Sequence, residues 1–408
     1  MICRHCSASQ SQLFLDLGHA PPSNAYLSAN DLSKPEKYYP LRVHVCRTCW
    51  LVQTEDYAQA EELFTPDYAY FSSTSTTWLD HARAFCHQIR DRLALGRQSF
   101  VVEIASNDGY LLRNFVEWGI PCLGIEPTAG TAAVAEALGI SVKRDFFGET
   151  FARHLAKEGQ YADLIVGNNV YAHVPDINDF TRGLAALLKP EGVVTLEFPH
   201  LARLIEHSQF DTVYHEHFSY LSLHSVCRIF TAAGLRVWDV EELPTHGGSL
   251  RVYGCLAGSH RPPLNRVAEL LTLEEAAGLT RPATYQGFQA KADKVKNDLL
   301  SWLIEQKRAG RLVAAYGAAA KGNTLLNYAG VKRDLLCYVC DASHGKQGKY
   351  LPGSHLPIVS PDELRSATPD VLLILPWNIA REVREQLSDL SNRGVQFATA
   401  VPSLQLLQ

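Results

Sequence analysis

The sequence predicts an α/β protein with two separate sheets and a small cysteine-rich segment in front of them. Short apolar runs alternate with stretches of helical periodicity over residues 100–199, and the same alternation returns over residues 311–402. Such alternation is typical of βαβ units that build a parallel sheet. Between the two regions, residues 264–308 have the charge content and spacing of helices.

Length and composition indicate a globular chain of more than one domain. Its 408 residues exceed the size of an ordinary domain, and 46% of them are hydrophobic, so a sizeable core is available. The net charge of −5 gives no electrostatic basis for binding nucleic acid or an anionic membrane. No apolar run approaches the roughly 20 residues that span a bilayer. Because the N-terminus carries no apolar signal segment, we expect a cytoplasmic protein.

The cysteines nearest the N-terminus predict a structural zinc site. Cys3 and Cys6 form one Cys-x2-Cys pair, and Cys46 and Cys49 form another. Four thiolates in two tight pairs suit a closed tetrahedral site, which leaves no open position for catalysis. We expect the zinc to replace a core that residues 1–60 are too few to build, and the alternative is a set of free thiols.

Other elements follow from periodicity and from glycine positions. A helix is expected from Trp78 to Leu95, with Gly96 ending it. The runs "LRVWDVEELP" and "SLRVYGCLA" predict a β-hairpin around "THGG". A further pair, Cys337 and Cys340, has no companion pair and lies in the apolar run "LLCYVCDA", so a buried strand with two core cysteines is expected there.

A candidate nucleotide site lies at the carboxyl ends of the first strands. The segment "VVEIASNDGYLLRNF" reads as a strand, a small polar turn and a helix, so backbone N–H groups and the helix N-terminus would meet a ligand there. It lacks the G-x-G-x-x-G dinucleotide fingerprint. The next strand ends at Glu126, whose carboxylate could accept both hydroxyls of a ribose. The third ends at Asp145 before Phe146, an acid and an aromatic ring that suit an adenine.

The order of strand, E-x-A-x-N-D-G turn, helix, strand and glutamate resembles the class I S-adenosylmethionine (SAM) methyltransferases. That family has a glycine-rich turn, E/D-x-G-x-G-x-G, of which only Gly109 remains here. The resemblance implies SAM as the cofactor, and the alternative is an α/β domain that binds another nucleotide or none. The cofactor-binding residues that it implies are Glu103, Ala105, Asn107, Gly109, Glu126, Asp145, Phe146 and Asn168.

The chain also resembles, nearly from end to end, the SAM-dependent C-methyltransferases of deoxysugar pathways. These enzymes add a methyl branch to nucleotide-linked 4-keto-6-deoxyhexoses. The resemblance is carried by the two cysteine pairs, "EIASNDG", "NNVYAH", "DTVYHEHF", "HGG", "YGAAAKGN" and "PWN", which occur in this order.

The family resemblance implies a role for each polar residue of these motifs. A carbon next to a ketone loses a proton when a base is positioned and the enolate oxygen is stabilised. His217 corresponds to the base, which suits a histidine because its pKa lies near neutral. Glu216 and Tyr214 correspond to groups that hold the sugar and orient the base, and His173 to a histidine beside the cofactor. Tyr70 is matched to a tyrosine from the linker, with Tyr68 as the alternative.

The histidines of "YHEHF" also have other interpretations. A regular strand would place His215 and His217 on one face and Tyr214 and Glu216 on the other, so a shared site for Glu216 and His217 requires a strand end or a bulge. We expect His215 at the surface or behind the site. A metal site on His215 and His217 has no obvious third ligand. His173 and His217 could each be structural histidines.

The second α/β region carries a candidate anion site. "VAAYGAAAKGNTLLN" reads as strand, small-residue turn and helix, and Lys321 adds a positive charge near the helix start. The family resemblance implies a nucleotide-sugar held between the two α/β regions, with its pyrophosphate here. The implied contacts are His246 at the domain junction, Lys321, Asn323, Trp377 and Asn378, although Trp377 could equally be a core residue.

Together these features predict a zinc-binding lobe over residues 1–65, a SAM-dependent methyltransferase domain over residues 66–260 and a nucleotide-sugar-binding domain over residues 261–408. The expected reaction is C-methylation, preferably at C3, of a 4-keto-6-deoxy sugar linked to dTDP or GDP. The alternatives are a nucleotide-sugar ketoreductase or epimerase, and a zinc-ribbon binding protein without catalysis. The sequence does not define the oligomeric state, and we take a monomer as the working hypothesis.

Overall fold

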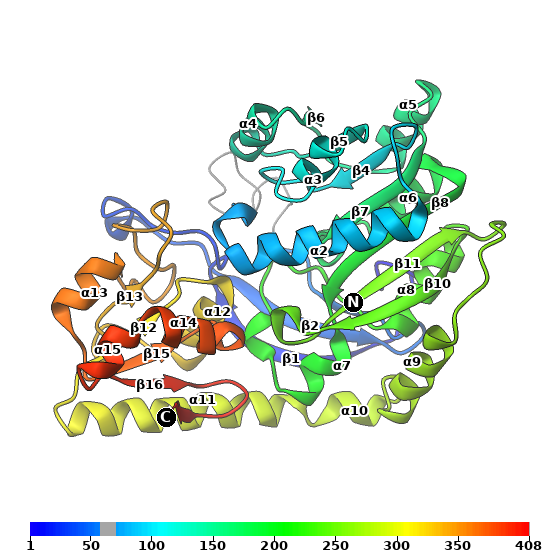
Figure 1. The fold of residues 1–408 in the computed structure, drawn as a ribbon. Helices are drawn as coiled ribbons and strands as arrows, with labels where there is room; N and C mark the ends of the chain where they lie inside the picture. The colour runs from blue at the N-terminus through cyan, green and yellow to red at the C-terminus, as the bar shows by residue number, and fades with distance from the viewer. Residues whose placement is uncertain (58–70, 408) are drawn as a thin grey trace.

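The computed structural model describes residues 1–57 and 71–407, which form three β-sheets with helices around them (Figure 1). The first sheet belongs to the N-terminal segment, the second to the central α/β unit and the third to the C-terminal α/β unit. Within these residues no helix is both long enough and apolar enough to cross a bilayer.

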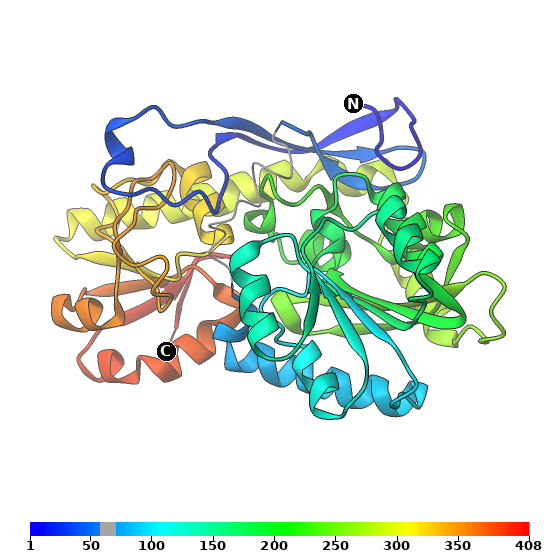
Figure 2. The ribbon, with the colours of Figure 1, turned by 90° about the horizontal axis from the view of Figure 1, so that it is seen from above.

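The N-terminal sheet is antiparallel and has the order β1-β2-β3-β9. Its strands span Ser11–Ala20, Tyr39–Cys46, Val52–Thr54 and Ser219–Tyr220. The last strand, β9, comes from the middle of the chain and directly follows the "YHEHF" motif. Phe14 and Leu15 of β1 share one hydrophobic core with Phe288 of helix α11 (Phe288–Arg308). The N-terminal strands therefore pack against α11, as Figure 2 shows, rather than depending on zinc alone for a core.

The central sheet has the strand order β10-β11-β8-β7-β4-β5-β6. In that order the strands span Leu235–Leu243, Ser249–Leu256, Leu188–Pro199, Ala162–Asn168, Val101–Ile104, Cys122–Ile125 and Ser141–Lys143. Strands β8, β7, β4, β5 and β6 are parallel to one another, whereas β11 is antiparallel to both of its neighbours, β10 and β8. This is the topology of a class I methyltransferase, and it contains the expected hairpin.

Helices cover both faces of this sheet. Val101 and Val102 are neighbours in β4, yet they belong to different cores because successive side chains of a strand point to opposite faces. On the Val101 face lie α2, α3 and α4, which span Thr76–Leu93, Leu112–Glu117 and Ala129–Ala137. On the Val102 face lie α5, α6 and α8, which span Glu149–Lys157, Ile177–Leu187 and Leu223–Ala232.

Helix α2 differs slightly from the helix expected between Trp78 and Leu95. It starts at Thr76 because the Ser75 side chain accepts a hydrogen bond from the Trp78 N–H, which caps the helix. It ends two residues before the expected position, because Ala94 adopts a left-handed conformation with φ of 50°. Gly96 therefore lies beyond the helix end and does not terminate it.

The C-terminal sheet has the order β14-β13-β12-β15-β16-β17 and is parallel except for β17. Its strands span Ile358–Val359, Val339–Cys340, Val313–Tyr316, Val371–Ile374, Gln396–Thr399 and Gln405–Leu407. Helices on its two faces, α12 to α15, span Ala320–Ala329, Pro361–Ala367, Ala380–Gln386 and Ser388–Asn392. The connecting helices α9 and α10 span Asn265–Ala276 and Pro282–Gln286.

The strand expected around Cys337 and Cys340 is shorter than predicted. Strand β13 contains only Val339 and Cys340, and Cys340 is buried in the core as expected. Cys337 precedes the strand and is only half-buried. It is therefore not the second core cysteine that the apolar run predicted.

Candidate functional site

The four N-terminal cysteines converge on one point. Their Sγ atoms all lie within 4.8 Å of one another, with Cys3 and Cys49 3.5 Å apart and Cys6 and Cys46 3.6 Å apart. Thiolates that share a tetrahedral zinc ion at about 2.3 Å lie roughly 3.8 Å from each other, so this cluster fits zinc. All four positions are filled by protein sulfur, which makes the site structural.

The two cysteine pairs adopt the same backbone turn. The Ser7 N–H donates to the Cys3 carbonyl, and the Trp50 N–H donates to the Cys46 carbonyl, both at 3.0 Å. Ser7 and Trp50 each take a left-handed conformation, with φ of 59° and 64°. Each residue after the second cysteine is thus bent so that both thiols of its pair face the centre.

The turn after β4 has the backbone of a glycine-rich loop although it has one glycine. Ala105, Asn107 and Gly109 occupy the positions at which the family pattern has glycines, and all three have positive φ values of 55°, 50° and 79°. A Cβ on Gly109 would meet the end of the Ile140 side chain and lie 3.2 Å from the Ala135 Cα, and the positive φ of Gly109 also favours glycine. The loop keeps its shape at Ala105 and Asn107 despite the cost of left-handed backbone for these residues.

Two acidic residues flank this turn. The Glu126 carboxylate, 4% exposed at the end of β5, accepts the Asn107 N–H at 2.9 Å and the Thr128 N–H at 2.9 Å. Glu103 lies at β4, and its burial, together with the nearby charge of Asp108, raises the pKa of this carboxyl well above its ordinary value. Both carboxylates are therefore buried next to this turn.

The remaining cofactor candidates lie at the carboxyl ends of neighbouring strands. Asn168 ends β7, and both polar atoms of its side-chain amide are buried without a hydrogen-bond partner among the described residues. A buried amide without a partner is costly, so the position of Asn168 at the end of β7 fits a ligand. Asp145 and Phe146 are exposed just after β6, and Phe146 leaves 44% of its surface open for stacking.

The "YHEHF" motif forms a turn rather than a strand. The His217 N–H donates to the Tyr214 carbonyl at 3.0 Å, which closes the chain on itself before β9 begins. The Tyr214 and His217 rings consequently lie 4.0 Å apart between centroids. His215 points the other way, with its Nε2 within 3.3 Å of the carbonyl oxygens of Tyr39 and Pro40. His215 therefore lies behind the site, as expected.

His217 has the properties of a neutral base. Its Nδ1 lies 3.0 Å from the Thr212 carbonyl, which can only accept a hydrogen bond, so Nδ1 carries the proton and Nε2 keeps its lone pair. Within residues 1–57 and 71–407, no protein group hydrogen-bonds Nε2. Burial, and secondarily the neighbouring His173, lower the pKa of His217 well below its ordinary value.

His173 lies beside His217 in the short helix η3 (Tyr171–His173), with the two rings 4.5 Å apart. The Phe218 N–H donates to the Ala172 carbonyl at 2.8 Å, which ties η3 to the turn. Burial lowers the pKa of His173 to about 4, so this imidazole is also neutral near pH 7. The structure thus brings Tyr214, His217 and His173 together.

Glu216 has a partner that the sequence did not reveal. Its carboxylate is 2% exposed and accepts hydrogen bonds from Asn24 Nδ2 at 3.0 Å and 2.9 Å. Asn24 lies in the N-terminal segment, 192 positions earlier in the chain. No motif or spacing links the two residues, so no local signal could have identified Asn24.

His246 closes another side of the same region. It lies in the hairpin turn η5 (Thr245–Gly247) with a positive φ of 55°, and its Nε2 is 3.0 Å from Asn169 Nδ2. Desolvation, and then the charge of Lys321, lower the pKa of His246 to about 4. Asn169 follows the cofactor candidate Asn168 and was not itself predicted.

Three of the C-terminal candidates cluster beside this hairpin turn. Lys321 Nζ donates to Asn378 Oδ1 at 2.7 Å and lies over the Trp377 ring, 4.8 Å from its centroid. Trp377 Nε1 donates to Asp211 Oδ2 at 2.7 Å. Asp211 is fully buried, and burial raises the pKa of its carboxyl to about 6. The sequence did not identify Asp211 as the anchor of this group.

One of the C-terminal candidates stands apart from this cluster. Asn323 is buried, and its Nδ2 donates to the Ser23 carbonyl at 3.1 Å, so it contacts the N-terminal segment instead. Tyr70 and its alternative Tyr68 lie outside the described residues.

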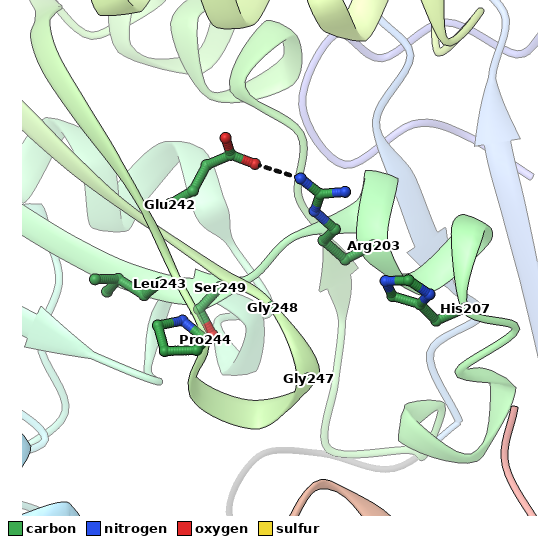
Figure 3. Close-up of a pocket in the computed structure, with 8 residues that line it drawn as sticks. All are labelled: Arg203, His207, Glu242, Leu243, Pro244, Gly247, Gly248 and Ser249. Atoms are coloured by element: carbon green, nitrogen blue, oxygen red, sulfur yellow. Dashed lines mark hydrogen bonds and ion pairs between the residues drawn. The ribbon is translucent and has the colours of Figure 1, made fainter.

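A surface cavity of about 450 Å³ lies next to the hairpin turn (Figure 3). Its lining contains none of the predicted site residues and consists of Arg203, His207, Glu242, Leu243, Pro244, Gly247, Gly248 and Ser249. Arg203 is already paired with Glu242 at 2.9 Å, so its charge is satisfied without a ligand. We assign no role to this cavity.

Removing one thiolate should abolish zinc binding. In Cys46→Ser the ion loses one of its ligands, so we expect loss of the single bound zinc and a melting temperature lowered by several degrees. Elemental analysis and thermal unfolding measure the two effects. Cys337→Ser, which alters a cysteine outside the cluster, should keep its zinc. Retention of full zinc by Cys46→Ser would contradict the assignment.

Acidification should destabilise the fold through its desolvated histidines. The pKa values of His173 and His246 fall from 6.5 to about 4 in the folded chain, so only the unfolded chain binds protons at these sites between those values. Their contribution to stability is therefore complete above pH 6.5 and is lost as the pH falls toward 4. Melting temperatures across this range should decline less steeply for His173→Gln than for the parent chain.

The exposed His154 provides the control, because its replacement by glutamine leaves the desolvated histidines unchanged. His154→Gln should reproduce the pH dependence of the parent chain. If the melting temperatures of His173→Gln and the parent fall equally steeply with decreasing pH, His173 does not contribute to the acid destabilisation.

Family models match nearly the whole chain. They are described as a zinc binding domain over residues 3–64, a methyltransferase domain over residues 78–240 and a C-methyltransferase C-terminal domain over residues 244–402. A ubiquinone biosynthesis O-methyltransferase of Yersinia enterocolitica is 30% identical over 96 residues, which cover 23% of this chain and 40% of the relative.

Among solved structures, an S-adenosylmethionine-dependent methyltransferase from Clostridium acetobutylicum aligns with 44% of this chain and 92% of its own, at 10% identity and a TM-score of 0.36, too low to carry an argument. The C-methyltransferase NovU of Streptomyces niveus is 33% identical over 400 residues, which cover 98% of this chain and 95% of NovU. Because that likeness spans both chains and the three family models divide the sequence in the same order, the chain belongs to the C-methyltransferase family and is a SAM-dependent C-methyltransferase with a zinc-binding domain.

Proposed function

We propose that the enzyme methylates the carbon next to the ketone of a nucleotide-linked 4-keto-6-deoxy sugar, at C3. The resemblance to deoxysugar C-methyltransferases supports this substrate class. Residues 1–65 would bind zinc, residues 66–260 would bind SAM, and residues 261–408 would hold the nucleotide, with dTDP or GDP as the expected carrier. The matching models of a methyltransferase domain and a C-methyltransferase C-terminal domain favour this function over the ketoreductase, epimerase and zinc-ribbon alternatives.

The observation that carries this proposal is the neutral His217 imidazole with an unprotonated Nε2. Nε2 would take the proton from C3, and the electron pair of the broken C–H bond would delocalise onto the C4 oxygen as an enolate. SAM supplies an electrophilic methyl group. The enolate carbon would form the new bond to this methyl, and S-adenosylhomocysteine would leave.

The neighbours of His217 would position the sugar. Tyr214 and Glu216 come from the same turn and offer a hydroxyl and a carboxylate to the ring substituents. His173 lies beside His217 and would line the path between the two reactants. Tyr70 is retained as a further contact by resemblance.

The SAM crevice would use residues at the ends of four strands. Glu126 would accept the ribose hydroxyls, and Asp145 and Phe146 would hold the adenine. Glu103, Ala105, Asn107, Gly109 and Asn168 would surround the methionine part. The Asn168 amide has no hydrogen-bond partner in the part of the chain that the structure describes, and a bound ligand would satisfy it.

The nucleotide would bind near the C-terminal cluster. Lys321 would pair with the pyrophosphate, Trp377 would stack on a ring, and Asn378 and His246 would hydrogen-bond. Asn323 is less suited to direct contact, because its amide already holds Ser23.

His217→Ala tests the proposed base. The variant and the parent enzyme would be incubated in D2O with SAM and freshly made dTDP-, GDP- or CDP-linked 4-keto-6-deoxy sugars, and products followed by mass spectrometry. The parent should yield a methylated sugar, and His217→Ala should lose methylation by at least about 100-fold. His154→Ala, which removes an exposed histidine, should keep full activity.

Two results would contradict the proposal. Deuterium incorporation without methylation would indicate an epimerase. A folded, SAM-binding parent enzyme that methylates no sugar of the panel would exclude the substrate class.

Glu126→Ala tests the cofactor crevice. Losing charge-assisted hydrogen bonds to the ribose should raise the Kd for SAM by about 10- to 100-fold. Isothermal titration calorimetry measures the change directly. Glu136→Ala removes an exposed carboxylate paired with Arg144 and should leave the Kd unaltered. An unaltered Kd in Glu126→Ala would remove the ribose assignment.

A further inference from the structure

Asn24 makes its side-chain contact with a residue of the proposed active site. The Asn24 amide nitrogen donates to both oxygens of the Glu216 carboxylate, at 3.0 Å and 2.9 Å. Hydrogen bonds to a charged acceptor are stronger than neutral ones, and a donor shared by both oxygens fixes where the carboxylate lies. The contact therefore sets the position of Glu216 relative to His217, its neighbour in the turn.

The loop that carries Asn24 is itself held by the C-terminal unit. The Ser23 carbonyl accepts the Asn323 amide at 3.1 Å, and the Tyr26 hydroxyl donates to the Ala318 carbonyl at 2.6 Å. Ala318 belongs to the small-residue turn before α12. The loop that carries Asn24 is thus hydrogen-bonded to the C-terminal unit on one side, while Asn24 itself contacts the turn of Glu216 on the other.

The chemistry of a buried carboxylate explains what the Asn24 contact can do for Glu216. Burial favours the protonated form of a carboxyl group, and hydrogen bonds to the ionised form oppose that effect. An asparagine donates without bringing a charge, so it supports an ionised Glu216 without forming a competing ion pair. A lysine in its place would neutralise the charge that the substrate hydroxyls would meet.

We infer that Asn24 is a positioning residue of the reaction, which holds the Glu216 carboxylate aimed at the substrate beside His217. This inference rests on the proposed function, because it assigns Glu216 to the sugar. It makes the N-terminal segment a contributor to the active site and not only a support for zinc.

Asn24→Asp tests the inference, because it keeps the shape of the side chain and replaces its donor by a second carboxyl group. Two carboxyl groups at hydrogen-bond distance retain a shared proton to higher pH. The acid limb of the kcat profile should therefore move to higher pH. At neutral pH, kcat should fall about 10- to 100-fold while the KM for SAM stays within about twofold.

Asn30→Asp is the matched control. It makes the same change at an exposed position of the same segment, and its kcat and pH profile should equal those of the parent. Zinc content and melting temperature report whether each variant folds. If Asn24→Asp does not fold, Asn24→Ala replaces it, and deuterium exchange into the sugar should fall together with methyl transfer.

Three results would overturn the inference. These are an unchanged kcat in either Asn24 variant, a lower kcat with the parental pH profile in Asn24→Asp, and equal losses in kcat and in SAM affinity. Crystal structures of the parent and of Asn24→Ala give a test that needs no substrate. The Glu216 carboxylate should move in the variant, and an unmoved carboxylate would overturn the inference even if the substrate class proves wrong.

Discussion

The turn from Tyr214 to His217 is clamped between two other parts of the chain, and the geometry of the site depends on this clamp. The Thr54 hydroxyl of β3 donates to the His217 carbonyl at 2.9 Å. From the other side, the Thr324 hydroxyl of α12 donates to the Val213 carbonyl at 2.9 Å. Both carbonyl groups of the turn boundary are thus satisfied by residues outside the central unit. The imidazole of His217 is placed by contacts of the turn backbone with strand β3 and helix α12.

Desolvation then decides the chemistry of the groups that the clamp brings together. A neutral imidazole is favoured wherever water is excluded and no carboxylate is adjacent to compensate. His217 and His173 face each other at 4.5 Å, so protonating one would disfavour protonating the other. Burial also favours the neutral form of Asp211, but for a carboxyl group this means a raised pKa. The charge of Lys321 opposes the rise. Among the described residues, burial thus keeps Nε2 of His217 unprotonated without a hydrogen bond from another protein group.

Local patterns predicted the parts of this structure that depend on local sequence. The Cys-x2-Cys spacing identified all members of the zinc cluster, and alternating periodicity identified both α/β sheets. The loop at Ala105 and Asn107 was less evident, because its conformation is that of glycines that the sequence does not contain. Residues 214–217 were expected in a strand that ends or bulges, whereas the closing hydrogen bond makes them a turn. The roles of Asn24 and Asp211 could not be predicted from the sequence, because tertiary contacts alone define them.

The zinc cluster affects the position of His217 through the register of strand β3. This strand has three residues, which pair with β2, and only Val52 and Gln53 pair with β9, so both ladders are short and fix its register weakly. A slip of one residue would turn the Thr54 hydroxyl away from His217. Cys49 anchors the strand shortly before its start, and Arg4, which lies inside the first cysteine pair, donates to the Gln53 side chain at 3.0 Å and to the Thr54 carbonyl at 2.9 Å. The metal site therefore holds the strand that contacts His217, the proposed base.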